Sequence, residues 1–220
     1  MTILPIVITG EPVLHRPTRP VTDFGPDFQR LIEDMYETMD AALGVGLAAT
    51  QVGSDLRVFV YEYANDDAAD RGVIVNPRLS LGKISQEDPD PEEESEGCLS
   101  VPGLSFPLKR AEWVRVSGQD AQGAPLEFEA HGWFARVMQH ETQHLDGQLY
   151  VDHLNRRWSA KARKAILDSI QAQGDAIGVG NPDATALITA ISQFIETPGQ
   201  TLVIKLTPRA KAPALQLMQL

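Results

Sequence analysis

Residues 131–154, HGWFARVMQHETQHLDGQLYVDHL, decide the fold, because a helical pattern runs through them and carries two histidines one turn apart. Glu141 follows the first histidine and gives H-E-x-x-H, the spacing at which two imidazoles bind one metal ion while the glutamate handles a proton. A pair of merely structural histidines is the alternative. At 100° per residue, four side chains lie within about 40° of one another on one helical face. They are Trp133, Val137, His140 and His144.

A third metal ligand is available in EGCLSVPG, residues 96–103, which holds the only cysteine, Cys98. A catalytic tetrahedral metal takes three protein ligands and keeps its fourth position for water, and a thiolate is a soft anionic donor. The alternative is that Cys98 is a small buried hydrophobic residue. One cysteine excludes an internal disulfide framework. The pattern predicts a metal bound by Cys98, His140 and His144.

Composition limits the function classes. The chain has 220 residues and a net charge of −11. Seven of its acidic residues lie in EDPDPEEESE, residues 87–96, a stretch that we predict to be a solvated loop. No basic cluster favours binding to nucleic acid, so direct DNA binding is not expected. The first residues lack a basic segment, and no apolar stretch reaches the ~20 residues that span a bilayer. We expect no membrane partner and a cytoplasmic location.

Short strands without helices between them indicate an α+β fold with antiparallel sheets. A helix is predicted from Pro26 to about Leu43, ending at Gly44. The glycine-rich stretch GVGLAATQVG, residues 44–53, permits close backbone approach. Strands are predicted at residues 56–63, 72–76, 78–84, 112–118 and 125–131.

Three motifs in this order, GVGLAATQVG (44–53), EGCLSVPG (96–103) and QHETQHLDG (139–147), closely resemble those of bacterial peptide deformylases. The resemblance covers roughly residues 5–157, and the acidic insertion looks actinobacterial. It implies antiparallel sheets around a central H-E-x-x-H helix and a catalytic domain at 1–174. Gln143 departs from the family, which often has an acid there, but this position is not a ligand.

The resemblance implies a metallohydrolase that removes the N-terminal formyl group from formyl-methionyl polypeptides emerging from the ribosome exit region. A metal ion would lower the pKa of a bound water, which attacks the formyl carbon while Glu141 acts as general base. Gln51 and the backbone N–H of Leu99 would stabilise the oxyanion. The family implies Fe²⁺, and Zn²⁺, Ni²⁺ or Co²⁺ could occupy the purified protein.

Selection of methionine requires an apolar pocket beside the metal. Trp133, Val137 and Val45 are candidates to line it, with core packing as the alternative explanation. Gly46 and its neighbours are predicted to pair with the substrate backbone as an added strand.

Other features leave alternatives open. Glu96 and Arg110 could form an ion pair that braces the cysteine loop, or an ordinary surface pair. Residues 175–220 form an extension of unknown role, read as a helix, a turn and a strand. A zinc endopeptidase also uses H-E-x-x-H but takes its third ligand from His, Glu or Asp, so Cys98 argues against it. A deformylase-like binding protein without catalysis is the other alternative.

Overall fold

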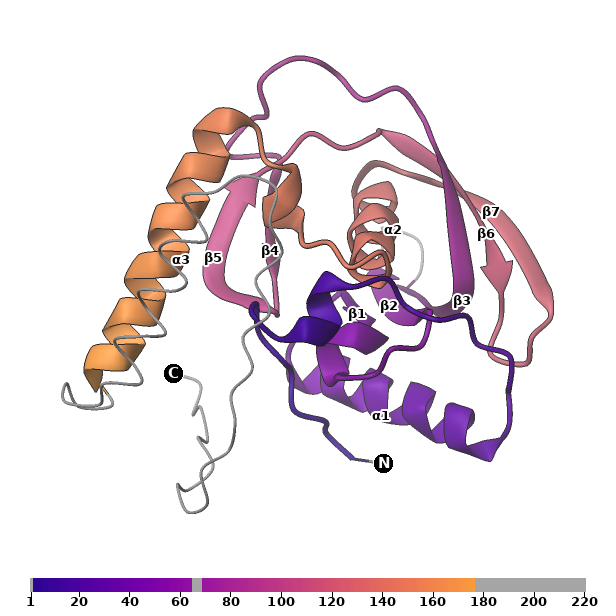
Figure 1. Cartoon of the computed structure of the whole chain (residues 1–220). Coiled ribbons are helices and arrows are strands. Elements are labelled where there is room, and N and C mark those ends of the chain that lie inside the picture. The colour runs from indigo at the N-terminus through magenta and orange to yellow at the C-terminus, as the bar shows by residue number, and fades with distance from the viewer. Residues whose placement is uncertain (1, 65–68, 177–220) are drawn as a thin grey trace.

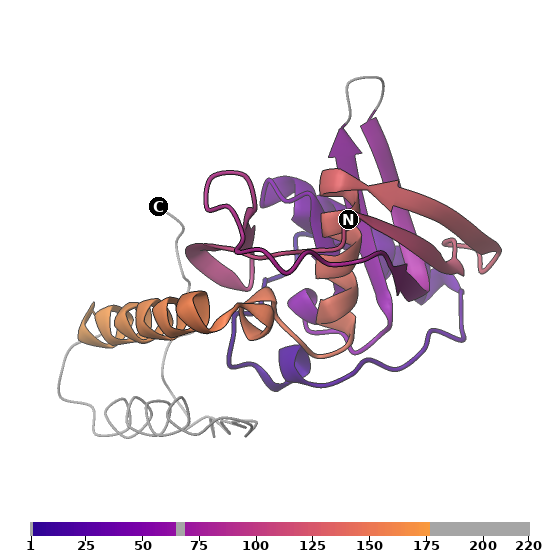
Figure 2. The ribbon, with the colours of Figure 1, turned by 90° about the horizontal axis from the view of Figure 1, so that it is seen from above.

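Antiparallel strands build two sheets, and the H-E-x-x-H helix lies between them (Figures 1 and 2). The computed structural model describes residues 2–64 and 69–176. In chain order the elements are η1 (Pro12–His15), α1 (Pro26–Ala41), β1 (Gly46–Ala48), η2 (Ala49–Val52), β2 (Val58–Ala64), β3 (Ala69–Leu81), β4 (Ser95–Cys98), β5 (Val101–Pro107), β6 (Trp113–Gln119), β7 (Pro125–His131), α2 (Gly132–Leu145), η3 (Tyr150–His153) and α3 (Arg156–Ala176).

The larger sheet has five strands in the order β1-β2-β3-β6-β7, and every neighbouring pair is antiparallel. The smaller sheet pairs β4 with β5. These sheets confirm the predicted α+β fold with antiparallel strands around a central helix.

Strand β2 begins with an apolar run, residues 58–61, which is buried because both faces of the sheet are covered there. Val58 and Val60 pack with α1, whereas Phe59 and Tyr61 pack with α2. Side chains alternate across a strand, so a continuous apolar run suits burial on both faces. The core is therefore divided into two layers by the sheet.

Helix α1 begins at Pro26, as predicted, since the fixed φ of proline suits the first helical position. The predicted end, about Leu43, is two residues late. Leu43 adopts a left-handed φ of 54° and its side chain is 93% exposed, so it no longer belongs to the buried helical face. The chain then passes directly into the glycine-rich stretch.

The prediction of separate strands at 72–76 and 78–84 is wrong. Strand β3 is continuous, but its register against β6 shifts between Val75 and Arg78. Asn76 has a left-handed φ of 52° at this bulge, and Pro77 cannot donate a ladder hydrogen bond. The strand ends at Leu81, so 82–84 lie outside it. The other predicted strands are found within two residues of their expected limits, at β2, β6 and β7.

Three strands and one α-helix were not predicted, namely β1, β4, β5 and α3, and neither were the three short 3-10 helices. Strand β1 has three residues and β4 has four, too short for an alternating pattern to show. Strand β5 and α3 cover a separate apolar cluster that includes Leu14, Phe106 and Tyr150. This cluster holds β4, and hence the cysteine motif, beside the rest of the molecule.

Helix α3 runs alongside the smaller sheet (Figure 1) and crosses the predicted domain limit at 174 before it reaches Ala176. The division into 1–174 and 175–220 stays a prediction. The helix, turn and strand predicted within 181–208 lie outside the described residues. Within residues 2–64 and 69–176, no helix is long and apolar enough to cross a membrane.

Candidate metal centre

Three side chains that suit a divalent metal converge between α2 and β4. His140 and His144 stand one turn apart on α2, with ring centroids separated by 5.0 Å. Cys98, the last residue of β4, brings its Sγ to 3.2 Å from Nε2 of His144. One ligand atom from each of the three lies within 4.8 Å of the others. The fold thus brings together the ligands that the sequence predicted.

The surroundings of the two imidazoles fit a cation. Nδ1 of His140 lies 2.9 Å from Oε2 of Glu96, so donation from Nδ1 leaves Nε2 free to bind a metal. Burial alone would lower the pKa of His140, but Cys98 and Glu96 raise it to about 10, so the surroundings of this ring stabilise a positive charge and a bound metal would take the place of the proton. Burial holds the pKa of His144 well below its ordinary value, so this ring stays neutral and able to ligate. The donors and the local charge therefore fit a divalent metal ion.

Glu96 is the centre of a buried charge network. Its carboxylate accepts hydrogen bonds from Nε and Nη2 of Arg110 at 3.0 and 3.1 Å, and Nη1 of Arg136 lies 3.5 Å away. Burial would raise the pKa of Glu96, but the bond with His140 and the charge of Arg110 lower it to about 2. The Glu96 and Arg110 side chains are each 5% exposed, so the surface-pair alternative is wrong. The solvated-loop prediction is wrong for Glu96 as well.

Glu141 faces strand β1 at very short range. A Cβ added to Gly46 would lie 2.5 Å from Oε1 of Glu141, so only glycine leaves room for this carboxylate. Oε2 of Glu141 is buried and has no hydrogen-bond partner in the described part of the chain. Burial raises the pKa of Glu141 to about 7 although His140 opposes the shift. A carboxyl group with this pKa suits proton transfer near neutrality.

Gln51 is buried with its amide nitrogen directed at the cysteine motif. Its Oε1 accepts a hydrogen bond from the backbone N–H of Ala48 at 2.8 Å, which fixes the amide orientation. Nε2 then lies 3.3 Å from Oγ of Ser100 and 3.8 Å from Sγ of Cys98. Leu99 follows Cys98 directly and packs against the α1 cluster. The arrangement brings a side-chain donor to the metal ligands.

The residues predicted to line a methionine pocket lie in different surroundings. Val137 is 6% exposed and belongs to the core between α2 and the sheet, which agrees with the alternative explanation of core packing. Trp133 is 48% exposed and stacks on the guanidinium group of Arg136. Val45 is 55% exposed. Their contact with substrate stays a prediction.

Sequence reasoning missed the groups that support the ligands from outside. The ring of Tyr150 stacks on His140 at a centroid distance of 5.9 Å, and its hydroxyl donates to the Leu104 carbonyl at 3.1 Å. Arg136 and Ser100 also escaped notice. Ser100 lies within the EGCLSVPG motif, but nothing in its residue type or spacing marks it or the other two as supports of the ligands. Glu96, two residues before Cys98, was noticed only as a partner of Arg110.

Comparison with known proteins gives the class of the chain. A family model described as polypeptide deformylase matches residues 3–159. The peptide deformylase of Mycolicibacterium paratuberculosis is 55% identical over 174 residues, which cover 76% of this chain and 88% of that protein. The peptide deformylase of Mycobacterium leprae is 53% identical over the same shares of both chains.

Solved structures agree. A peptide deformylase from Legionella pneumophila is 36% identical with a TM-score of 0.68, over 78% of this chain and 98% of that one. The enzyme from Thermus thermophilus is 41% identical with a TM-score of 0.64, over 77% and 94%.

The chain therefore belongs to the polypeptide deformylase family. Its similarity to the mycobacterial proteins confirms the predicted actinobacterial character, and the predicted limits of 5–157 agree with the matched residues 3–159. The prediction of a metal-dependent hydrolase that removes an N-terminal formyl group is confirmed at the level of the family. The catalytic mechanism, the metal and the roles of single residues are taken up as proposals.

Proposed function

We propose that this chain hydrolyses the formyl group of N-terminal formyl-methionine with Glu141 as general base. The observation that carries this proposal is a buried carboxylate oxygen, Oε2 of Glu141, without a partner among the described residues, beside the convergent donors of Cys98, His140 and His144. A buried acceptor without a hydrogen bond is costly, so a site that keeps one has a use for it.

When bound by these three residues, a divalent metal supplies Lewis acidity, which polarises the formyl oxygen and lowers the pKa of water. Glu141 takes the proton from the attacking water and passes it to the departing amine, which needs a group that exchanges protons near neutral pH. The pKa of about 7 produced by burial supports this role. Gly46 supports it as well, because a larger residue would displace the carboxylate.

The oxyanion that develops on the formyl group needs donors already in place. Nε2 of Gln51 is oriented by the bond from Ala48 to Oε1, and it is directed at Cys98. The backbone N–H of Leu99, next to the ligand, is the second donor. The Gln51 amide is held in this orientation before substrate arrives, and the oxyanion would take over its contact with Ser100 or Cys98.

Strand β1 suits the recognition of an extended peptide. It lies at the edge of the larger sheet, paired with β2 on one side only. A substrate that adds a strand beside Gly46 would bind through its backbone, which tolerates many sequences. The methionine side chain would then be selected by Val45, Val137 and Trp133.

We assign Fe²⁺ as the metal in the cell, with Zn²⁺, Ni²⁺ or Co²⁺ able to replace it. One thiolate and two imidazoles bind all four, and availability decides among them. We further place the protein in the cytoplasm near the ribosome exit region. Helix α3 supports this location, because it carries a group of exposed cations, overlooked in the sequence, that would suit an RNA-rich surface. They are Arg156, Arg157, Lys161, Arg163 and Lys164.

Formate release from a formyl-Met tripeptide by anaerobically purified protein tests the proposal. Release should stop with a chelator and return with added Fe²⁺. Glu141→Gln should retain one metal ion per chain and lose turnover. Full activity in this variant would refute the mechanism, and cleavage of an internal peptide bond would favour an endopeptidase. Metal binding without any release would favour a binding protein.

A further inference from the structure

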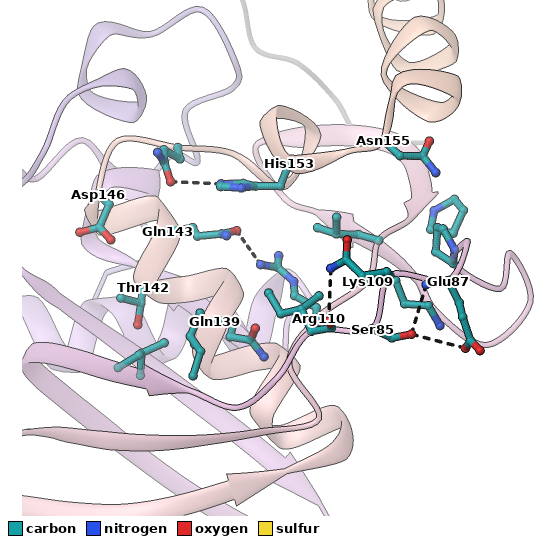
Figure 3. Close-up of a pocket in the computed structure, with 18 of the residues that line it drawn as sticks. Ser85, Glu87, Lys109, Arg110, Gln139, Thr142, Gln143, Asp146, His153 and Asn155 are labelled. Carbon is teal, nitrogen blue, oxygen red and sulfur yellow. Dashed lines mark hydrogen bonds between the residues drawn. The ribbon is translucent and has the colours of Figure 1, made fainter.

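A cavity of about 580 Å³ lies along α2 (Figure 3), and neither Cys98 nor the two histidines line it. Four residues of α2 line it with the spacing i, i+3, i+4 and i+7, which gathers them on one helical face. They are Gln139, Thr142, Gln143 and Asp146. His140 and His144 occupy a different face. The cavity is therefore separate from the catalytic site, and its size is typical of a small-molecule site.

One wall of the cavity is apolar and partly open to solvent. Leu79, Leu81, Ile84 and Leu108 contribute to it. Leu81 is 51% exposed and Ile84 is 38% exposed, so apolar surface remains uncovered at the end of β3. Covering such surface with an apolar group is favourable.

The floor of the cavity holds an unused polar group. Thr142 is 6% exposed, and its Oγ1 is buried without a hydrogen-bond partner in residues 2–64 and 69–176. Figure 3 shows Thr142 between Gln139 and Gln143 on the helix. A ligand that reaches this hydroxyl would satisfy a group that is otherwise costly to bury.

The charged groups of the lining discriminate against anions because its cations are already paired. Arg57 lies 2.8 Å from Asp146, and Lys109 lies 2.7 Å from Glu94. Arg110 binds Glu96 and also donates to Oε1 of Gln143 at 2.6 Å, the contact drawn in Figure 3.

Unlike the paired cations, two carboxylates at the rim contact neutral side chains. Oε2 of Glu87 is 3.4 Å from the hydroxyl of Ser85, and Oδ1 of Asp88 is 3.3 Å from Nδ2 of Asn155. Both contacts are hydrogen bonds with neutral groups. The charge of Glu87 also acts on Lys109, but Glu94 already neutralises that ammonium group, so negative charge is in surplus at the rim. An apolar wall, an unsatisfied hydroxyl and an acidic rim together define the chemistry of the occupant.

We propose that this cavity binds a small amphipathic primary amine. Its apolar body would cover Leu81 and Ile84, and its ammonium group would lie beside Glu87 and Asp88. Depending on the length of the ligand, a polar atom on its body would bond to Thr142. The site is formed between α2 and the acidic insertion, so the insertion gains a binding role that a solvated loop lacks.

Three probes with one shape and three charges test the proposal: cyclohexylmethylamine, cyclohexylmethanol and cyclohexanecarboxylate. Each is titrated into the full-length zinc-loaded chain, and the backbone amide shifts of Leu81, Ile84 and Thr142 are followed by NMR. The amine should bind about three- to fivefold tighter than the alcohol, as expected for partly exposed ion pairs. The carboxylate should bind more weakly than both.

Matched double variants separate the rim from the overall acidity of the loop. Glu87→Gln with Asp88→Asn should abolish the preference for the amine over the alcohol. Glu92→Gln with Glu93→Gln removes the same charge from the same loop, outside the cavity, and should preserve that preference. Equal losses in both variants, a carboxylate that binds as well as the amine, or no saturable shift at the three amides would overturn the proposal.

Discussion

Replacing Glu96 with glutamine removes one buried negative charge while it preserves the shape of the side chain. Arg110 and Arg136 are 9% and 8% exposed, so both guanidinium groups would remain buried without their carboxylate. Removing one partner of a buried ion pair typically costs about 3–5 kcal/mol. The glutamine oxygen can still accept one hydrogen bond, so we expect the metal-free variant to lose about 3 kcal/mol of unfolding free energy.

The same substitution should weaken metal binding. Glu96 holds Nδ1 of His140 at 2.9 Å and so orients the ring and increases its basicity as a ligand. Loss of such an outer partner lowers metal affinity by about 10- to 100-fold. The assays are urea unfolding of the metal-free chain and competition with a chromophoric chelator for Zn²⁺. Glu92→Gln, an exposed change in the same loop, is the control. An E96Q variant with wild-type stability and zinc affinity would refute this account of the network.

Four further outcomes are expected. Gly46→Ala, which places a methyl group 2.5 Å from Oε1 of Glu141, should lower kcat for formate release about 100-fold with metal content unchanged. Gln51→Ala should lower kcat about 100- to 1,000-fold, measured beside urea unfolding to exclude a folding defect. Cys98→Ala should retain no stoichiometric metal by elemental analysis. Burial lowers the pKa of His15 from its ordinary value of 6.5, so the unfolded chain takes up its proton first as the pH falls. Stability should therefore decline below about pH 6.5, and His15→Gln should make the decline in unfolding free energy shallower.

The convergence of the three candidate ligands could be predicted because their signals are local or depend on residue type. His140 and His144 share a helical face by spacing alone, and Cys98 is the only thiol in the chain. Helix α1 and strands β2, β6 and β7 have apolar patterns that can be recognised from the local sequence alone, without knowing which elements pack beside them. Strand β4 has no such pattern, and its place depends on pairing with β5, which packs against α3.

The role of Glu96 could not be predicted, because nothing in residues 87–96 distinguishes the one buried acid from its exposed neighbours. Its burial depends on Arg110 and Arg136, which come from a loop and from α2 and meet only in the folded chain. The cavity beside Thr142 likewise requires the acidic insertion to lie against α2.

The sequence by itself determined the donor atoms of the centre, because a thiol, two imidazoles and a carboxylate are fixed by residue type. It also determined the α+β class through the periods of its apolar residues. Only the tertiary structure decided which charges are buried, which backbone lies against Glu141, and where the cavity beside α2 opens. These properties depend on distances between residues far apart in the chain, and the free energies of desolvation and close packing are set by those distances.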